Sequence, residues 1–215
     1  PFGMILVTGP TGSGKSTTLY SVLNQLNTPE RNIITIEDPV EYLVEGITQV
    51  QVRPEIGLDF SSGLRSLLRQ SPDVIMIGEI RDSETADIAI KAALTGQIVL
   101  STLHTNDAIS SITRLIDMGV EPFLVASSVV MLCAQRLARK ICLKCRKPIE
   151  IPEDFLKKIG FTGKANFYNA AGCKYCNNTG FYGRIAILEA ININDEIRDM
   201  IIEKKSIDYI KKYAQ

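Results

Sequence analysis

The sequence carries no excess of charge of either sign, because 24 lysines and arginines balance 24 aspartates and glutamates in 215 residues. A balanced chain has no overall field that favours nucleic acid or an anionic membrane surface. It also lacks a signal peptide and any apolar run near the roughly 20 residues that a membrane-spanning helix needs. Only two residues separate Pro1 from the first predicted strand. We therefore expect a longer parent protein, and the missing signals carry little weight.

Histidine is scarce, with His104 alone, and cysteine occurs five times. Four of the cysteines form two C-x-x-C pairs separated by 27 residues: Cys142, Cys145, Cys173 and Cys176. Paired C-x-x-C knuckles are typical of a tetrahedral Zn²⁺ site, although this spacer exceeds the commonest length of about 15 to 20 residues. Four thiolate ligands leave no open coordination position on zinc, so the metal would have a structural role. A metal site rather than disulfides also indicates a reducing compartment. Redox-active thiols are the alternative.

The main chemical motif lies near the start of the chain and fits the pattern G-x-x-x-x-G-K-[ST]. It comprises Gly9, Pro10, Thr11, Gly12, Ser13, Gly14, Lys15, Ser16 and Thr17. Glycines let the backbone N–H groups approach phosphate oxygens closely. Lys15 brings a positive charge to the β- and γ-phosphates, and Ser16 offers a hydroxyl ligand for Mg²⁺. The motif follows a predicted buried strand at 4–7 and opens a predicted helix at 16–26, whose N-terminus favours an anion. This context favours a phosphate site over a plain turn.

Acidic residues follow two further predicted strands. Glu37, Asp38 and Glu41 come after the strand at 32–36, and Glu79 ends the apolar run that begins at residue 73. The carboxyl ends of parallel strands meet at one edge of an open α/β sheet, where ligands bind. We expect Glu79 to hold Mg²⁺ or its waters, and the first cluster to bind Mg²⁺, orient a water or act as a base. A polar strand end with an acidic turn is the alternative.

The rest of the first 140 residues alternates helices with one more strand. A helix from residue 60 carries Arg65 and Arg69 on one face, where they could be solvated or salt-bridged, or could clamp the γ-phosphate or a neighbouring subunit. A second helix follows a cap at Asp82 or Ser83. A strand at 97–103 delivers His104, a candidate γ-phosphate sensor or a structural residue.

Two more helices complete this part of the pattern. We predict a helix that is capped by Asn106 or Thr105, runs through Ile109 and Ile116, and stops at Gly119. Another begins at Pro122 and continues through Leu132, with Cys133 on it as a small buried residue. The remainder predicts a short helix at 153–159, a strand at 183–188 and amphipathic helices from 195. Basic residues cluster around the first cysteine pair.

Several motifs together resemble one family. GPTGSGKSTT, TIEDPVEY, GLDFSSGLRSLLRQSPDVIMIGEIRD and STLHTND resemble the secretion ATPases of the type II secretion and type IV pilus assembly group. The two cysteine pairs, followed by residues 180–184, resemble the zinc-bearing extension of the secretion and pilus-extension members. The pilus-retraction members typically lack this extension, so the resemblance favours assembly or secretion.

The resemblance implies roles for individual residues. The position of Glu41 implies a general base for the attacking water, and that of Glu79 implies an organiser of Mg²⁺. His104 matches the family's histidine box, whose first histidine is replaced here by Gln97. Arg65, Arg69 and Arg81 match arginines around the nucleotide cleft. In the family a smaller N-terminal domain precedes this core and closes over the nucleotide.

We therefore predict an α/β chain with a RecA-like P-loop core and a mainly parallel sheet at 1–140, a Cys₄ zinc module at 141–182, and a C-terminal strand and helices at 183–215. The expected activity is Mg²⁺-dependent hydrolysis of ATP to ADP in a motor for secretion or pilus assembly. The resemblance implies a ring, with six copies, at the cytoplasmic face of the inner membrane on a platform protein, without nucleic acid. A RecA-like nucleic-acid translocase, a small-molecule kinase and a fragment that binds nucleotide without activity are the alternatives.

Overall fold

The computed structural model describes residues 2–214. They form two compact units: unit 1 comprises residues 2–136 with 188–214, and unit 2 comprises Leu137–Ile187. None of the described helices is long and apolar enough to cross a membrane. The predicted boundaries at residues 140 and 182 stay a prediction.

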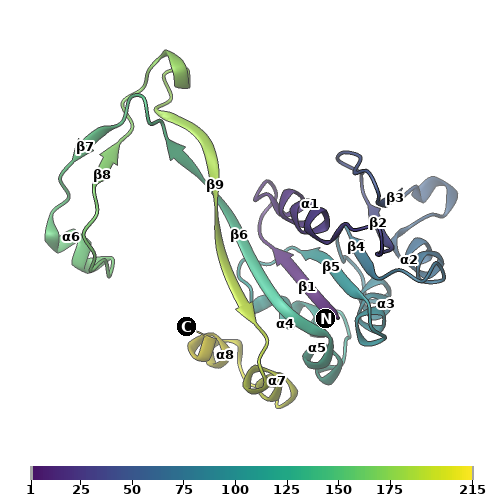
Figure 1. The fold of residues 1–215 in the computed structure, drawn as a ribbon. Coiled ribbons are helices and arrows are strands. Elements are labelled where there is room, and N and C mark those ends of the chain that lie inside the picture. The colour runs from purple at the N-terminus through teal and green to yellow at the C-terminus, as the bar shows by residue number, and fades with distance from the viewer. Residues whose placement is uncertain (1, 215) are drawn as a thin grey trace. The chain divides into compact units, whose positions relative to one another are not determined.

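A seven-stranded sheet with the order β3-β2-β4-β5-β1-β6-β9 forms the centre of unit 1 (Figure 1). The pairs from β3 to β6 are parallel, which confirms the predicted α/β class. Strands of a parallel sheet are buried on both faces by helices, which explains why these strands appear in the sequence as continuous apolar runs. The bounds are β1 Gly3–Thr8, β2 Ile33–Glu37, β3 Thr48–Gln51, β4 Val74–Ile77, β5 Ile98–Leu103, β6 Val129–Ile141 and β9 Phe181–Asn192, the last two extending into unit 2.

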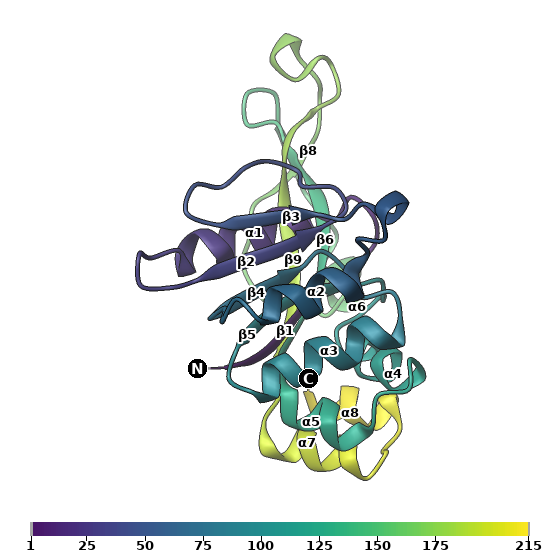
Figure 2. The same ribbon diagram turned by 90° about the vertical axis from the view of Figure 1, so that its right-hand side faces the viewer.

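Helices cover both faces of this sheet. On one face α1 packs on alternate strand residues such as Val7 and Met76. On the other, the other helices of unit 1 form one buried cluster with the residues between them, such as Leu6 and Ile77. Figure 1 and Figure 2 both place α7 beside α5. The bounds are α1 Lys15–Leu26, the 3₁₀ turn η1 Pro54–Ile56, α2 Phe60–Leu68, α3 Ser83–Leu94, α4 Ser110–Asp117, α5 Pro122–Ser128, α7 Asp195–Ile202 and α8 Ile207–Ala214.

Side-chain caps fix where several helices begin. The carboxylate of Asp82 accepts the N–H of Thr85 at 2.8 Å, which confirms Asp82 as a cap of α3. The predicted cap of α4 at Thr105 or Asn106 is wrong. Helix α4 begins at Ser110, and the side chain of its N-cap residue, Ile109, makes no capping bond; the carboxylate of Asp107 accepts the N–H of Ser110 at 2.9 Å.

The predicted long helix from Pro122 is also wrong. It ends at Ser128, and β6 starts at Val129 and pairs in parallel with β1 up to Thr8 and Ala134. Periodicity cannot separate a buried strand from a buried helix in such an apolar run, and pairing with β1 decides it. Cys133 therefore lies on a strand, buried as predicted, and burial raises the pKa of its thiol.

Unit 2 contains little regular structure apart from its stretches of β6 and β9. It has a small antiparallel ladder of β7 Lys147–Ile149 with β8 Phe167–Asn169, the helix α6 Glu153–Lys158 and the 3₁₀ turn η2 Lys174–Cys176. Both α6 and the strand predicted at 183–188 are present, the latter as part of β9. Unit 2 holds ten lysines and arginines against three acidic residues, so the neutral chain contains one strongly basic unit.

Candidate nucleotide site and metal centre

The predicted phosphate loop joins β1 to α1 at the carboxyl edge of the sheet. Gly9 has a φ of 141°, and a Cβ there would lie 2.3 Å from the carbonyl oxygen of Gln135. Gly14, at the N-cap of α1, adopts the left-handed conformation at φ 88°, and no side chain caps the helix. The first N–H groups of a helix have no partner within it. An uncapped helix start reached through glycines is a suitable cradle for a phosphate group.

Lys15 lies within this cradle, and its charge is tuned by its surroundings. Its Nζ donates to the carbonyl oxygens of Gly9 at 2.9 Å and Pro10 at 3.2 Å. Burial lowers the pKa of the Lys15 ammonium, and the negative charge of Glu79 acts in the opposite direction. This coupling places the acid that follows β4 in the electrostatic field of the loop lysine.

Glu79 lies between the side chains of Arg81 and His104. The Nη2 of Arg81 bonds to one carboxylate oxygen of Glu79, and the Nε2 of His104 lies 3.4 Å from the other. Arg81 also lies 3.9 Å from a carboxylate oxygen of Asp38. The side chain of Glu79 is only 15% exposed, whereas that of His104 is 55% exposed. His104 can therefore reach an incoming ligand while it contacts the acid.

The ends of β4 and β5 are tied together, which brings Glu79 to His104. Thr102 on β5 donates its hydroxyl to the carbonyl of Gly78 at 2.7 Å, and its own carbonyl accepts the N–H of Ile80 at 3.1 Å. The strands thus stay paired past Ile77. Two predicted site residues that are 25 positions apart in sequence consequently meet at one edge.

Glu41 lies in the exposed segment after β2, and a buried tyrosine of α1 anchors that segment. The hydroxyl of Tyr20 accepts the N–H of Glu41 at 3.3 Å, and the Tyr20 ring stacks on Tyr42 at 4.2 Å between centroids. The same hydroxyl donates to the carboxylate of Glu37. Burial, followed by this hydrogen bond, raises the pKa of Tyr20 to about 12.

Glu37 does not face the nucleotide edge as the sequence predicted. It is 4% exposed and accepts hydrogen bonds from Thr35 at 2.6 Å and Gln49 at 3.2 Å, as well as from Tyr20. A buried carboxylate with three donors is satisfied within the protein and has a structural role. The prediction for Glu37 as a ligand or base is therefore wrong.

The predicted arginines fall into two groups. Arg81 joins the site through Glu79, whereas Arg65 on α2 pairs with Glu84 on α3 at an exposed position. Arg69 lies exposed at the C-cap of α2. Within residues 2–214, neither Arg65 nor Arg69 makes a hydrogen bond or ion pair with Lys15, Glu79 or His104.

Gln97, which replaces the family's first box histidine, precedes the amino end of β5, whereas His104 follows its carboxyl end. Its side chain accepts the hydroxyl of Thr95 at 2.8 Å. Six strand residues at about 3.3 Å each separate the two positions by roughly 20 Å, so Gln97 lies far from His104.

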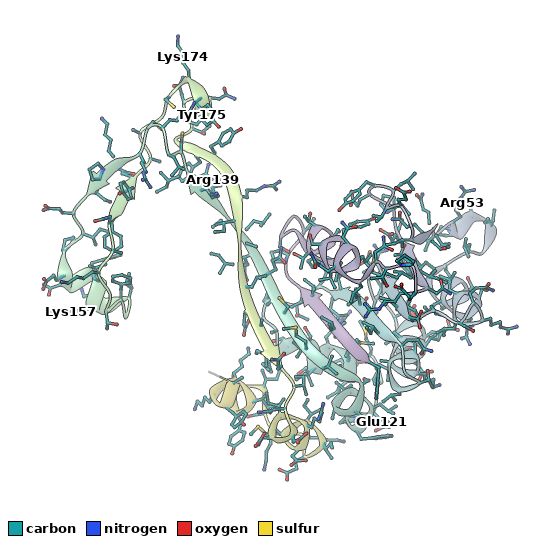
Figure 3. The ribbon with its side chains drawn as sticks, viewed as in Figure 1. Arg53, Glu121, Arg139, Lys157, Lys174 and Tyr175 are labelled. Carbon is teal, nitrogen blue, oxygen red and sulfur yellow. The ribbon has the colours of Figure 1, made fainter. Side chains whose placement is uncertain are left out.

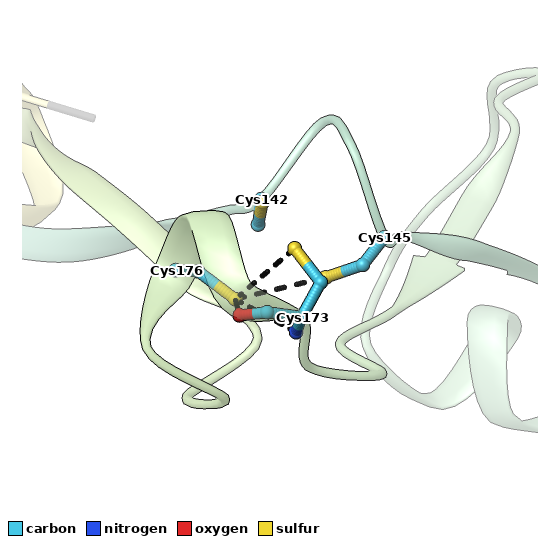
Figure 4. Close-up of side chains that lie close together, drawn as sticks. All are labelled: Cys142, Cys145, Cys173 and Cys176. Carbon is cyan, nitrogen blue, oxygen red and sulfur yellow. Dashed lines mark hydrogen bonds between the residues drawn. The ribbon is translucent and has the colours of Figure 1, made fainter.

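The four paired cysteines of unit 2 converge on one point (Figure 4). Their sulfur atoms all lie within 4.8 Å of one another, and Cys176 Sγ lies 3.8 Å from the sulfurs of both Cys145 and Cys173. A tetrahedron with Zn–S bonds of about 2.3 Å has edges of about 3.8 Å, whereas a disulfide needs about 2.05 Å. The donor set therefore fits a tetrahedral thiophilic metal.

Backbone N–H groups orient the second cysteine pair. Cys176 Sγ accepts the N–H groups of Cys173 and Gly180, each at 3.2 Å. Although burial acts to raise it, these bonds bring the pKa of the Cys176 thiol down to about 6. Thiolate is the form that binds metal.

Cations of unit 2 lie on aromatic rings around this cluster. Arg139 lies over Phe181 and Lys144 over Tyr175, with 4.1 Å and 3.9 Å to the ring centroids. Figure 3 labels Arg139, Lys174 and Tyr175, the last two of which lie between Cys173 and Cys176 in the sequence. Such contacts hold long cationic side chains in place.

Sequence reasoning missed three residues that position the site: Tyr20, Thr105 and Gln135. Each bonds to a segment of the site that is distant in sequence, so no local motif marks it: Tyr20 to Glu41, Thr105 to Thr8 and Gln135 to Ser13. The only signal was a polar side chain at a position where strand or helix periodicity predicted burial.

The whole chain, residues 1–215, matches the sequence profile of the family described as Type II/IV secretion system protein. The chain belongs to this family. It is 53% identical over 201 residues to the type II secretion system protein E of Dickeya dadantii, covering 94% of this chain and 40% of that protein. It is 52% identical over 219 residues to the type IV pilus assembly ATPase PilB of Myxococcus xanthus, covering 100% and 39%. The chain thus spans about two-fifths of these relatives.

Solved structures of a pilus retraction motor and of the ATPase DotB share the fold. The crystal structure of the pilus retraction motor PilT with bound ADP superposes with a TM-score of 0.74 at 33% identity, over 99% of this chain and 53% of PilT. The likeness confirms the predicted P-loop ATPase core.

Proposed function

We propose that this chain is the ATP-hydrolysing core of a motor that drives assembly of a type II secretion pseudopilus or a type IV pilus. One observation carries the proposal: Lys15, Glu79 and His104 are coupled at the edge where an uncapped helix start can receive phosphate. The names of the relatives supply the process, since they are called secretion and pilus assembly proteins.

The loop residues would bind the phosphates of ATP or ADP. Backbone N–H groups between Gly9 and Thr17 would donate to phosphate oxygens, and Lys15 would exchange its bonds to the loop carbonyls for the β- and γ-phosphates. Ser16, which is exposed at the start of α1, and Glu79 fit the oxygen donors that Mg²⁺ prefers. Bound Mg²⁺ would neutralise charge on the phosphates.

Hydrolysis would use three side chains around the γ-phosphate. Glu41 would accept the proton of the attacking water as general base, from a segment that Tyr20 holds. Lys15 would stabilise the negative charge that builds on the transferred group. His104 would sense the γ-phosphate and pass its presence to Glu79, which it contacts. Arg81, and Arg65 and Arg69 after rearrangement or in a ring, would supply further positive charge.

Cys142, Cys145, Cys173 and Cys176 would hold a structural Zn²⁺. The support is the four-thiol donor set, whose sulfur separations match a tetrahedron. With all positions taken by protein, the metal would stabilise unit 2 and take no part in hydrolysis.

The motor would act as a ring of identical copies, six by resemblance, at the cytoplasmic face of the inner membrane. Its proposed partners are further copies of itself and a platform protein of the secretion or pilus machine. Nucleotide-dependent rotation of domains within the ring would supply the mechanical work.

Turnover of ATP by the full-length protein tests this function. Glu41→Gln and Glu79→Gln should each abolish phosphate release while ADP and ATP still bind, because the loop and Lys15 are intact. Glu121→Gln is the matched control, since Glu121 is exposed at the start of α5 and its side chain makes no capping bond. Undiminished turnover in Glu41→Gln would contradict the assignment of the general base.

The charge of unit 2 favours a second candidate, a nucleic-acid translocase. Its ten basic residues against three acidic ones, with aromatic rings beneath several cations, are features of nucleic-acid-binding surfaces. DNA or RNA that stimulates ATP turnover and binds with a steep salt dependence would support this candidate. An ATP turnover rate that neither DNA nor RNA changes would exclude a nucleic-acid translocase.

A further inference from the structure

Gln135 occupies a special place behind the phosphate loop. Strand β6 runs parallel to β1, and the last residues in register are Thr8 and Ala134. Gln135 is therefore the first residue of β6 beyond the end of β1, directly beside the loop. It is only 2% exposed, and its backbone carbonyl makes the close approach to Gly9 that excludes any side chain there.

The side-chain amide of Gln135 joins the loop to α1. Its Nε2 donates to the carbonyl oxygen of Ser13 at 2.8 Å, and its Oε1 accepts the hydroxyl of Thr18 at 2.7 Å. A carbonyl can only accept, so the Ser13 bond fixes which end of the amide faces the loop. One buried amide is thereby satisfied at both ends, by partners 122 and 117 residues away in sequence.

This bridge determines the orientation of one peptide group. In a trans peptide the carbonyl of one residue and the N–H of the next point in opposite directions. Because Gln135 holds the Ser13 carbonyl behind the loop, the N–H of Gly14 points away from Gln135. Gly14 starts α1 in the left-handed conformation, and its N–H belongs to the uncapped set that the cradle offers.

We propose that Gln135 is a positioning residue of the nucleotide site, which fixes the Ser13–Gly14 peptide so that the Gly14 N–H faces a bound phosphate. The inference rests on the proposed binding of nucleotide by the loop. It assigns to β6 a role in that site. Thr18 acts as the second anchor, because it fixes the amide plane from the side of the helix.

Variants of the full-length protein that break one bond at a time test the role. Gln135→Glu keeps the shape and the acceptor for Thr18 but turns the donor to Ser13 into a repelling oxygen. Thr18→Val removes the other bond, and Thr18→Ser keeps it. Cys133→Ala is the matched control, since Cys133 is buried two residues earlier, in the cluster of side chains that packs with α1.

The measurements are calorimetric affinity for ADP, KM and kcat for ATP, and hydrogen exchange of the loop. In Gln135→Glu we expect affinity for ADP to fall about tenfold, with a matching rise in KM and faster exchange between Gly9 and Thr17. Thr18→Val should weaken ADP binding less, and Thr18→Ser and Cys133→Ala should retain the wild-type affinity. A merely structural residue would lower the melting temperature without this pattern.

Wild-type affinity for ADP in a folded Gln135→Glu protein would overturn the inference. Should that variant not fold, unchanged ADP affinity and loop exchange in Thr18→Val would overturn it instead. If the wild-type protein binds ADP but does not hydrolyse ATP, the proposed motor function is wrong. The expected ADP affinities of the variants would still support the role of Gln135. A wild-type protein that binds no nucleotide would overturn both.

Discussion

The hydroxyl oxygens of Thr8 and Thr105 lie 2.7 Å apart, and this contact joins the end of β1 to the segment that follows His104. Thr8 also accepts the N–H of Thr105 at 2.8 Å and donates to the carbonyl of Leu103 at 2.9 Å. The two residues are 97 positions apart. The strand that leads into the phosphate loop is thereby bonded to both sides of His104.

Thr105→Val should slow ATP turnover while nucleotide affinity is retained. The substitution keeps the shape but removes the hydroxyl that contacts Thr8 and that lies 2.9 Å from the carbonyl oxygen of Asp107. We expect kcat to fall roughly tenfold, since small displacements of a catalytic group are costly. Thr105→Ser should restore turnover, and its failure to do so would show that packing matters more than the hydrogen bond. Steady-state kinetics and ADP calorimetry on the full-length protein decide this.

Tyr20→Phe should destabilise unit 1 by about 1–3 kcal/mol, because Glu37 loses one of its three donors in a buried position. The same change frees the backbone of Glu41, so turnover should fall as well. Chemical denaturation and phosphate release measure the two effects. Tyr209→Phe, at an exposed tyrosine of α8, should change neither.

The contribution of Tyr20 to stability should also depend on pH. Its pKa is raised from 10.0 to about 12 in the folded protein, so the neutral phenol is favoured by folding. The contribution is full below pH 10 and is lost as pH rises from 10 to about 12, by up to about 2–3 kcal/mol. The gap in unfolding free energy between wild type and Tyr20→Phe should narrow over that range. A gap that stays constant would contradict the raised pKa.

The purified protein should contain about one zinc per chain, and Cys176→Ser should lose it. ADP should still bind to the variant, because the phosphate loop belongs to unit 1 and the cysteines to unit 2. Elemental analysis and calorimetry measure the two properties. Cys133→Ser is the control and should retain the metal, since Cys133 lies outside the cluster. Absence of zinc from wild-type protein purified without chelators would contradict the assignment.

Gly9→Ala should be far more damaging than Gly12→Ala. Both glycines have positive φ, so each substitution carries backbone strain of about 1–2 kcal/mol. A Cβ on Gly9 would meet the carbonyl oxygen of Gln135 at 2.3 Å, whereas no atom lies within 4 Å of one on Gly12. Melting temperatures measured without nucleotide compare the two variants. Equal decreases would show that backbone strain alone, and not the contact with Gln135, determines the loss of stability.

Local patterns predicted much of the core. The strand before the loop, the helix after it and the acid that follows β4 were predicted from apolar runs, glycines and the rule that ligands lie at strand carboxyl ends. Pairing between distant segments could not be predicted in this way. The run from Pro122 to Cys133 satisfied a helical pattern, and only the neighbouring β1 turned its second half into a strand.

Alternation along a strand explains the error at Glu37. Ile33, Thr35 and Glu37 lie on one face of β2, which α1 covers, so Glu37 is buried although it ends the strand as a site residue would. Gln135 follows Cys133 by the same two-residue step on β6. A polar residue in step with buried ones is thus a signal for a bridging side chain, but the sequence does not identify its partners.

Helix α1 starts without a side chain to complete its first turn, so a phosphate bound there would supply the missing acceptors. A nucleotide in this position would therefore complete the hydrogen bonding of α1 as well as serve as substrate. By mass action, ADP at one hundred times its dissociation constant would add about 2.7 kcal/mol to the stability of the protein. Each cycle of release and rebinding would then loosen and tighten the start of one helix, and the strands on which α1 packs would experience that change directly.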